Sequence, residues 1–105
     1  MKYRIRYAPA ALNDMDAVWD DVLKASASYD IADKYIEDFA DKISAKSDFP
    51  ESGIPLYYRG LFTGFYSVNF KAYKAFYRIK NGSVEVVRVL PGKMEYMKIL
   101  FGESE

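Results

Sequence analysis

The chain contains neither cysteine nor histidine, and these two absences exclude several classes of function. Without cysteine it has no disulfide and no thiol nucleophile, and without histidine it has no Ser-His-Asp triad. A zinc site built from cysteine and histidine is excluded as well. A general base would have to be aspartate, glutamate, lysine or tyrosine. We expect no metal and no cofactor.

The sequence also lacks a long apolar run and an excess of charge of either sign. No run reaches the roughly 18 apolar residues of a membrane-spanning helix, and the N-terminus has no signal-peptide core. We therefore expect a cytoplasmic protein with no membrane partner. The net charge is +0 and the pI is about 6.3, so the overall composition does not indicate a nucleic-acid binder. A length of 105 residues predicts a single domain, residues 1–105.

Two apolar runs that flank Asn81-Gly82 predict a β-hairpin within residues 73–96. Asn and Gly tolerate the positive φ angles of a type I′ turn. Regular pairing then sets Phe76 opposite Val87 and Ala75 opposite Arg88. One face is predicted to be core: Tyr73, Ala75, Tyr77, Ile79, Val84, Val86, Arg88 and Leu90. The other face is mixed and is the expected working face: Lys74, Phe76, Arg78, Lys80, Ser83, Glu85, Val87 and Val89.

The N-terminal residues 2–7 alternate strictly between basic and apolar side chains, which predicts a half-buried strand. Its outer face carries Lys2, Arg4 and Arg6. Two interpretations of these cations stay open: they guard an edge strand in solvent, or they contact a partner directly.

Two helices are predicted to follow and to form an antiparallel pair. Pro9 suits the first turn of the first helix, whose apolar stripe is Leu12, Met15, Trp19, Val22 and Leu23. Ser28 or Asp30 caps the second helix, whose stripe is Ala32, Tyr35, Ile36, Phe39 and Ile43.

The rest of the chain indicates strands and a short C-terminal helix or tail. Residues 56–59 form a short strand candidate, residues 66–71 alternate like a strand that runs into the hairpin, and Pro91-Gly92 ends the last strand. The order predicts an α+β fold with the helix pair on one face of an antiparallel sheet. The other face is expected to be open and covered by a partner.

The sequence resembles the RelE/ParE superfamily of toxins from bacterial type II toxin–antitoxin modules. The likeness lies in the helix around residues 8–19, the loop at residues 49–55, and the hairpin segments 75–79 and 84–90. It implies a β-α-α-β-β-β fold and a cognate antitoxin that wraps the toxin and inhibits it. The residues expected to meet such a partner are Leu61, Phe62, Phe65, Phe76, Arg78 and Val87.

The superfamily has two arms, and the resemblance implies a different target for each. RelE-like members cut mRNA on the ribosome with a cluster of cations and a tyrosine, for which this chain offers only Lys74, Lys93 and Tyr96. Ser67 and Asn69 stand where that arm carries lysines. ParE-like members poison DNA gyrase, and residues 88–95 are closest to that arm. Gyrase is therefore the leading target. An mRNA endonuclease and a non-toxic member that only binds its antitoxin are the alternatives.

Overall fold

The computed structural model describes residues 2–101 and contains three helices and five strands within that range. Strand β1 (Arg4–Tyr7) leads into α1 (Pro9–Ser26) and α2 (Tyr29–Ser44), and two short 3₁₀ turns follow at Ala45–Ser47 and Pro50–Ser52. The remaining strands are β2 (Ile54–Tyr58), β3 (Leu61–Phe70), β4 (Tyr73–Lys80) and β5 (Ser83–Pro91), and α3 (Tyr96–Phe101) ends the described chain. The predicted α+β class is confirmed, and the strand candidate at residues 56–59 overlaps β2, which begins at Ile54 and ends at Tyr58.

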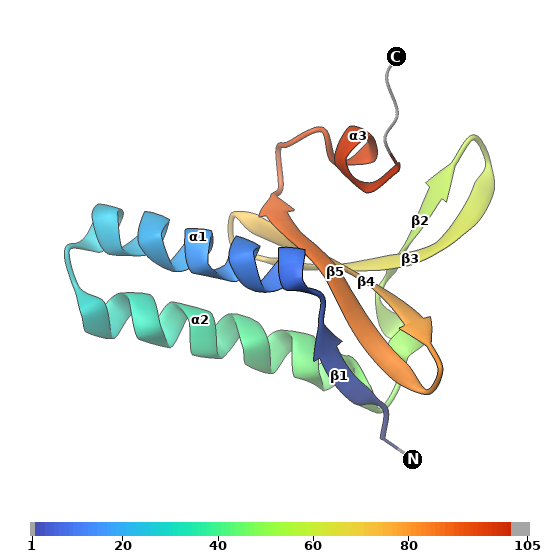
Figure 1. The fold of residues 1–105 in the computed structure, drawn as a ribbon, viewed down its shortest axis with the longest axis horizontal. Helices are drawn as coiled ribbons and strands as arrows, with labels where there is room; N and C mark the ends of the chain where they lie inside the picture. The colour runs from blue at the N-terminus through green and yellow to red at the C-terminus, as the bar shows by residue number, and fades with distance from the viewer. Residues whose placement is uncertain (1, 102–105) are drawn as a thin grey trace.

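The five strands form one mixed sheet in the order β1-β5-β4-β3-β2. Strands β2 to β5 pair antiparallel with their neighbours, whereas β1 runs parallel to β5. The sheet is thus mostly but not wholly antiparallel. Strand β1 can run parallel to β5 because the helix pair connects it to the other strands. A tight turn would require an antiparallel neighbour. Figure 1 shows α1 and α2 side by side along one side of this sheet.

The helix pair supplies one half of the core. Ser28 caps α2 by accepting a hydrogen bond from the Ile31 backbone N–H. The predicted stripe of α2 is confirmed, since Ala32, Phe39 and Ile43 are buried. The predicted stripe of α1 is shifted: Ala11, Met15 and Val18 are its buried residues, and Leu12 is 53% exposed. The small side chain of Ala11 lets α1 approach the sheet closely, so the buried face follows Ala11 and not Leu12.

The β4–β5 hairpin turns at Asn81 and Gly82, which both have positive φ as predicted. Its register is as expected from Lys80–Ser83 to Tyr77–Val86. The ladder then shifts by one residue, so Phe76 pairs with Arg88 and Ala75 with Val89. Val87 is the extra residue of a β-bulge, which sequence alternation alone does not reveal.

This bulge corrects the predicted faces of the second half of β5. Val89 pairs with Ala75 and joins the core beneath the helices, where it is 2% exposed. Arg88 pairs with Phe76 and therefore shares the face that carries Lys74, opposite to the expected arrangement.

The sheet face opposite the α1–α2 pair is partly covered by the chain itself. The ring of Phe76 lies 4.9 Å from that of Tyr96, and the ring of Phe65 lies 5.6 Å from that of Phe101. Phe76 is consequently only 1% exposed. The expectation that this face is left open is therefore wrong around Phe76. The reason is that α3 folds back onto it, which buries an aromatic side chain at a gain of about 2 kcal/mol.

Among the described residues, no helix is both long and apolar enough to cross a membrane.

Candidate functional site

Two of the three residues expected to handle RNA, Lys74 of β4 and Tyr96 of α3, lie together. The ammonium group of Lys74 stands 5.5 Å from the centre of the Tyr96 ring, a cation–π distance. The same ring packs on Phe76. Because the alternation of β4 places Lys74 and Phe76 on one face, a single aromatic residue of α3 contacts both.

Lys93, the third of these residues, is exposed in the turn after β5. Among the described residues it has no ion pair with a carboxylate. Of the two polar residues on the neighbouring strand, Ser67 is 5% exposed opposite Phe76, and Asn69 is exposed opposite Lys74. The structure thus assembles one cation, one tyrosine and one amide at this place, and not a cluster of cations.

A second polar group lies further along the same face, where Arg78 binds Glu85. The guanidinium Nε donates to the Glu85 carboxylate at 2.7 Å. The hydrogen bond from Arg78 lowers the pKa of Glu85, and the charges of Arg78, Lys80 and Arg6 lower it further. Arg78, named above as a partner-binding residue, keeps 40% of its side chain exposed.

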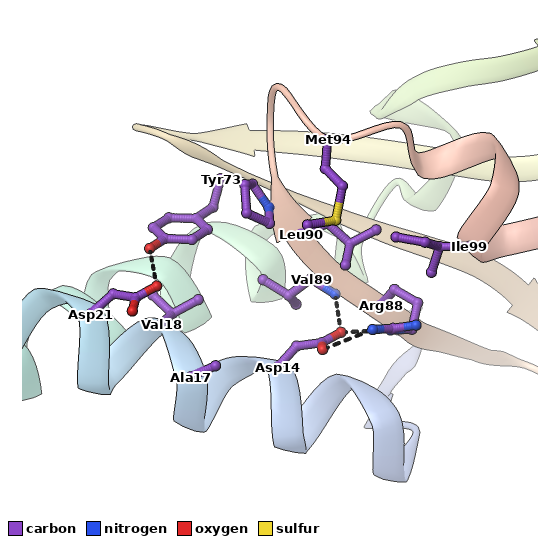
Figure 2. A pocket seen from close by; sticks show the side chains of 11 residues that line it. Asp14, Ala17, Val18, Asp21, Tyr73, Arg88, Val89, Leu90, Met94 and Ile99 are labelled. Carbon is purple, nitrogen blue, oxygen red and sulfur yellow. Dashed lines mark hydrogen bonds and ion pairs between the residues drawn. The ribbon is translucent and has the colours of Figure 1, made fainter.

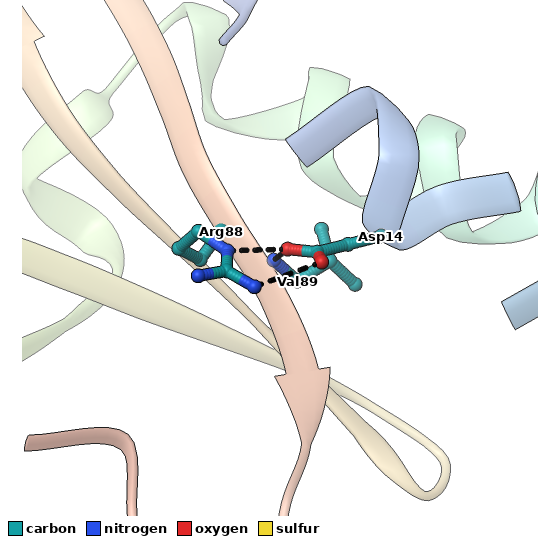
Figure 3. A network of polar contacts seen from close by, with 3 residues as sticks. All are labelled: Asp14, Arg88 and Val89. Carbon is teal, nitrogen blue, oxygen red and sulfur yellow. Dashed lines mark hydrogen bonds and ion pairs between the residues drawn. The ribbon is translucent and has the colours of Figure 1, made fainter. Parts of the chain in front are cut away.

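Asp14 and Arg88 form a clamp between α1 and the end of β5 (Figure 3). Arg88 donates to the two Asp14 oxygens at 2.7 and 3.0 Å, and the Val89 backbone N–H donates to Asp14 at 2.9 Å. Strand β1 ends opposite Val86, so Asp14 accepts the hydrogen bond that a longer neighbouring strand would accept. The carboxylate also raises the pKa of Arg88. Sequence analysis missed this clamp because 74 positions separate its two side chains.

A cleft of about 390 Å³ opens beside this clamp, between α1, the end of β5 and the C-terminal segment (Figure 2). The Tyr73 hydroxyl donates to Asp21 at 3.2 Å on its far side. Both carboxylates of the cleft are thus engaged, and no nucleophile is paired with a base there. It is lined by Asp14, Ala17, Val18, Asp21, Tyr73, Arg88, Val89, Leu90, Pro91, Met94 and Ile99. Such a cleft suits an apolar group better than it suits catalysis.

The hairpin of β2 and β3 carries the most exposed of the predicted partner-binding residues. Leu61 is 73% exposed and Phe62 is 47% exposed, close to the Arg59-Gly60 turn. Phe65 is half-buried against Phe101, and Val87 is half-buried at the bulge. The six predicted residues therefore do not form one surface. Two are open at the hairpin, and Phe76 is reached only past α3.

No group of three or more potential metal-binding side chains occurs among residues 2–101.

Known proteins resemble this chain both in sequence and in fold. Residues 5–96 match the family model described as "ParE toxin of type II toxin-antitoxin system, parDE". A chain of the chromosomal ParDE system from P. aeruginosa has a similar structure, with a TM-score of 0.71 and 15% identity, covering 86% of this chain and 96% of that chain. A chain of the toxin–antitoxin complex RelBE2 from Mycobacterium tuberculosis superposes with a TM-score of 0.58 and 23% identity, covering 87% and 99%. At these identities the two structures show the shared fold. No curated protein sequence matches this chain.

Proposed function

Because the chain belongs to the ParE toxin family of type II toxin–antitoxin systems, whose members an antitoxin neutralises, we propose that it acts by binding and poisoning DNA gyrase. The observation that carries this proposal is the family match over residues 5–96. This match places the chain in the ParE-like arm of the superfamily. For that arm the resemblance implies that the target is gyrase and that the toxin has no hydrolytic site. Such a toxin acts in the cytoplasm, where gyrase works.

The polar residues around Tyr96 also support gyrase as the target. Cutting RNA through the ribose 2′-hydroxyl needs a group that activates this hydroxyl and cations that stabilise the phosphate charge. Here Ser67, where RelE-like members carry a lysine, is buried and adds no cation to Lys74 and Tyr96. Lys93 stands exposed in its turn. A protein that works by binding needs none of these groups to be free.

A supercoiling assay with purified gyrase tests the proposal. We expect the full chain to inhibit supercoiling and to leave translated mRNA intact in primer extension. The variant Lys74→Ala serves as a control, since gyrase inhibition should not depend on a catalytic lysine. Unchanged supercoiling at saturating protein would contradict the proposal.

One observation favours the mRNA endonuclease as the second candidate, namely the contact of Lys74 with Tyr96. In that case primer extension shows codon-phased cuts with the wild-type chain, and Lys74→Ala abolishes them. A chain that affects neither gyrase nor mRNA, and whose expression leaves growth unchanged, is a member that only binds its antitoxin.

A further inference from the structure

The strands and the helix pair of this neutral protein carry opposite charges. The strands contain the cations Arg4, Arg6, Lys74, Arg78, Lys80 and Arg88, and Glu85 is their only carboxylic acid. In α1 and α2 carboxylates outnumber lysines: Asp14, Asp16, Asp20, Asp21, Asp30, Asp33, Glu37, Asp38 and Asp41 against Lys24, Lys34 and Lys42. A net charge of +0 therefore conceals two oppositely charged layers.

The pairing of β1 with β5 gathers four of these cations at one end of the open sheet face. Arg4 lies opposite Ser83 and Arg6 opposite Glu85, while Arg78 pairs with Glu85 from the other side. Lys80 also pairs with Ser83, so all four cations surround two residues of β5. We call this group, Arg4, Arg6, Arg78 and Lys80, the basic face. The pKa of Glu85 is lowered first by the hydrogen bond from Arg78 and further by the charges of Arg78, Lys80 and Arg6.

The basic face is accessible. Arg4, Arg6 and Lys80 are exposed, and Ile5 and Tyr7 turn the other way, toward the core. Within residues 2–101, neither Arg4 nor Arg6 makes an ion pair. The basic face lies toward the β4–β5 turn, whereas α3 lies near the opposite end of β5 (Figure 1). The helix that buries Phe76 therefore leaves Arg4, Arg6 and Lys80 exposed.

The dimensions of the basic face match a charged backbone. Alternate residues of one strand are roughly 7 Å apart, and neighbouring strands are about 4.8 Å apart. Two of the four cations are on β1 and two are on β4, with β5 between these strands, so they cover an area on the order of 7 by 10 Å. Duplex DNA presents one phosphate for roughly every 3.4 Å of helix axis on each strand, so two or three phosphates of one strand pass over a span of about 10 Å.

The composition of the basic face distinguishes between anionic partners. A protein partner is usually held by apolar or aromatic anchors, and three aromatic side chains of this sheet side pack against α3 instead, namely Tyr58, Phe65 and Phe76. Single-stranded nucleic acid is usually held by base stacking on exposed aromatic rings, and the basic face contains none. Cations without apolar anchors are suited to contacts with the phosphates of a duplex.

From this arrangement we infer that the basic face binds the phosphate backbone of duplex DNA, without reading its sequence. The inference does not depend on gyrase being the target. It assigns to this chain a nucleic-acid contact that neither its neutral charge nor its family match indicates.

Fluorescence anisotropy with a labelled duplex of about 30 base pairs tests the inference on the full chain. With about three phosphate contacts, the affinity should fall about 40-fold between about 50 and about 200 mM salt. The variant Arg4→Gln/Arg6→Gln should weaken binding at least about tenfold at the lower salt. It should also reduce the slope of log affinity against log salt by about 2. Both arginines are exposed, so the variant should fold, which thermal unfolding verifies.

The matched control is Lys24→Gln/Lys42→Gln, which removes the same charge from exposed positions of α1 and α2. It should leave duplex binding unchanged. Equal loss in both double variants, or no binding at the lower salt, would overturn the inference. So would tighter binding to single-stranded RNA, to polyglutamate or to vesicles containing phosphatidylserine than to the duplex.

Discussion

The hydroxyl groups of Tyr77 and Tyr7 are both buried, but they differ in their hydrogen bonding. The Tyr77 hydroxyl donates to the Pro50 carbonyl at 2.6 Å, and its ring stacks on Tyr66 at 5.5 Å. Gly53 permits this position, because a Cβ at residue 53 would collide with the Tyr77 oxygen. The Tyr7 hydroxyl has no partner among the described residues. The Tyr77 hydroxyl thus connects β4 to the loop before β2. The Tyr7 hydroxyl loses its hydration on burial, and no hydrogen bond to a described residue offsets that cost.

We predict that Tyr77→Phe lowers the free energy of unfolding by about 1–2 kcal/mol, through loss of the bond to Pro50. Tyr7→Phe is the matched control and should leave this free energy unchanged or slightly higher. Burial raises the pKa of Tyr77 to about 12 from the ordinary 10.0. Because this pKa is raised on folding, Tyr77 makes its full contribution to the free energy of unfolding below pH 10. That contribution is lost as the pH rises toward 12.

Urea denaturation of the wild type and both variants at neutral pH and at about pH 11 measures these effects. The difference between wild type and Tyr77→Phe should shrink at the higher pH. Equal stability of the two tyrosine variants at neutral pH would show that the Pro50 hydrogen bond does not stabilise the fold.

At the scale of elements, the sequence predicted those features of helices and turns that depend only on residues close together in the chain. The type I′ turn follows from Asn81-Gly82, and the buried stripe of α2 follows from its 3.6-residue period. The bulge at Val87 was not predictable, because an inserted residue is visible only in the pairing of two strands. The cover that α3 places on Phe76 was missed for a related reason. A six-residue helix has little periodicity of its own, and its position depends on contacts with distant strands.

The candidate site was predictable to a smaller extent for the same reason. Sequence reasoning selected Lys74 and Tyr96, which do meet, and Lys93, which lies exposed in its turn. It placed Arg88 with the core residues, whereas Arg88 pairs with Phe76 beyond the bulge and binds Asp14 of α1 at the edge of β5 that β1 does not cover.

The β2–β3 hairpin is the element that we expect an antitoxin to cover. Its side chains Tyr57, Leu61 and Phe62 are 59%, 73% and 47% exposed, and exposed apolar groups at one place usually mark a protein interface. We predict that Leu61→Ser/Phe62→Ser weakens the complex with the antitoxin at least about tenfold. Calorimetry with the purified product of the neighbouring reading frame measures this affinity.

The control for the hairpin variant removes apolar side chains of similar exposure from the helices. Leu12→Ser/Ile31→Ser changes two residues that are each 53% exposed on α1 and α2. It should bind the antitoxin like the wild type. An unchanged affinity of the hairpin variant would place the antitoxin elsewhere, for which the cleft beside Asp14 is the next candidate.

At the scale of the whole molecule, Glu85 limits the charge of the basic face. Its lowered pKa, due first to the hydrogen bond from Arg78, means that the ion pair stabilises the protein fully above pH 4.5. That stability is lost as the pH falls through the lowered value. Because Arg78 is 40% exposed, the pair contributes less than about 1 kcal/mol.

We therefore predict that Glu85→Gln slightly lowers stability at about pH 6, and that the difference from the wild type is smaller at about pH 3. The same change removes the only carboxylate of the five strands, which opposes the basic face, so affinity for duplex DNA should rise about threefold. Urea denaturation at the two pH values and anisotropy at low salt measure the two effects. A variant that binds the duplex more weakly would show that Glu85 orients Arg78 for binding and does not merely oppose it.

The separation of basic strands from acidic helices makes this neutral molecule an electric dipole. A charged surface within about one Debye length, ~8 Å at physiological salt, exerts a torque on such a molecule before contact. The protein therefore approaches anions and cations with opposite sides. An isoelectric point of about 6.3 suggests weak adsorption to any ion exchanger near neutrality, yet both kinds of resin should retain this protein, each through a different face.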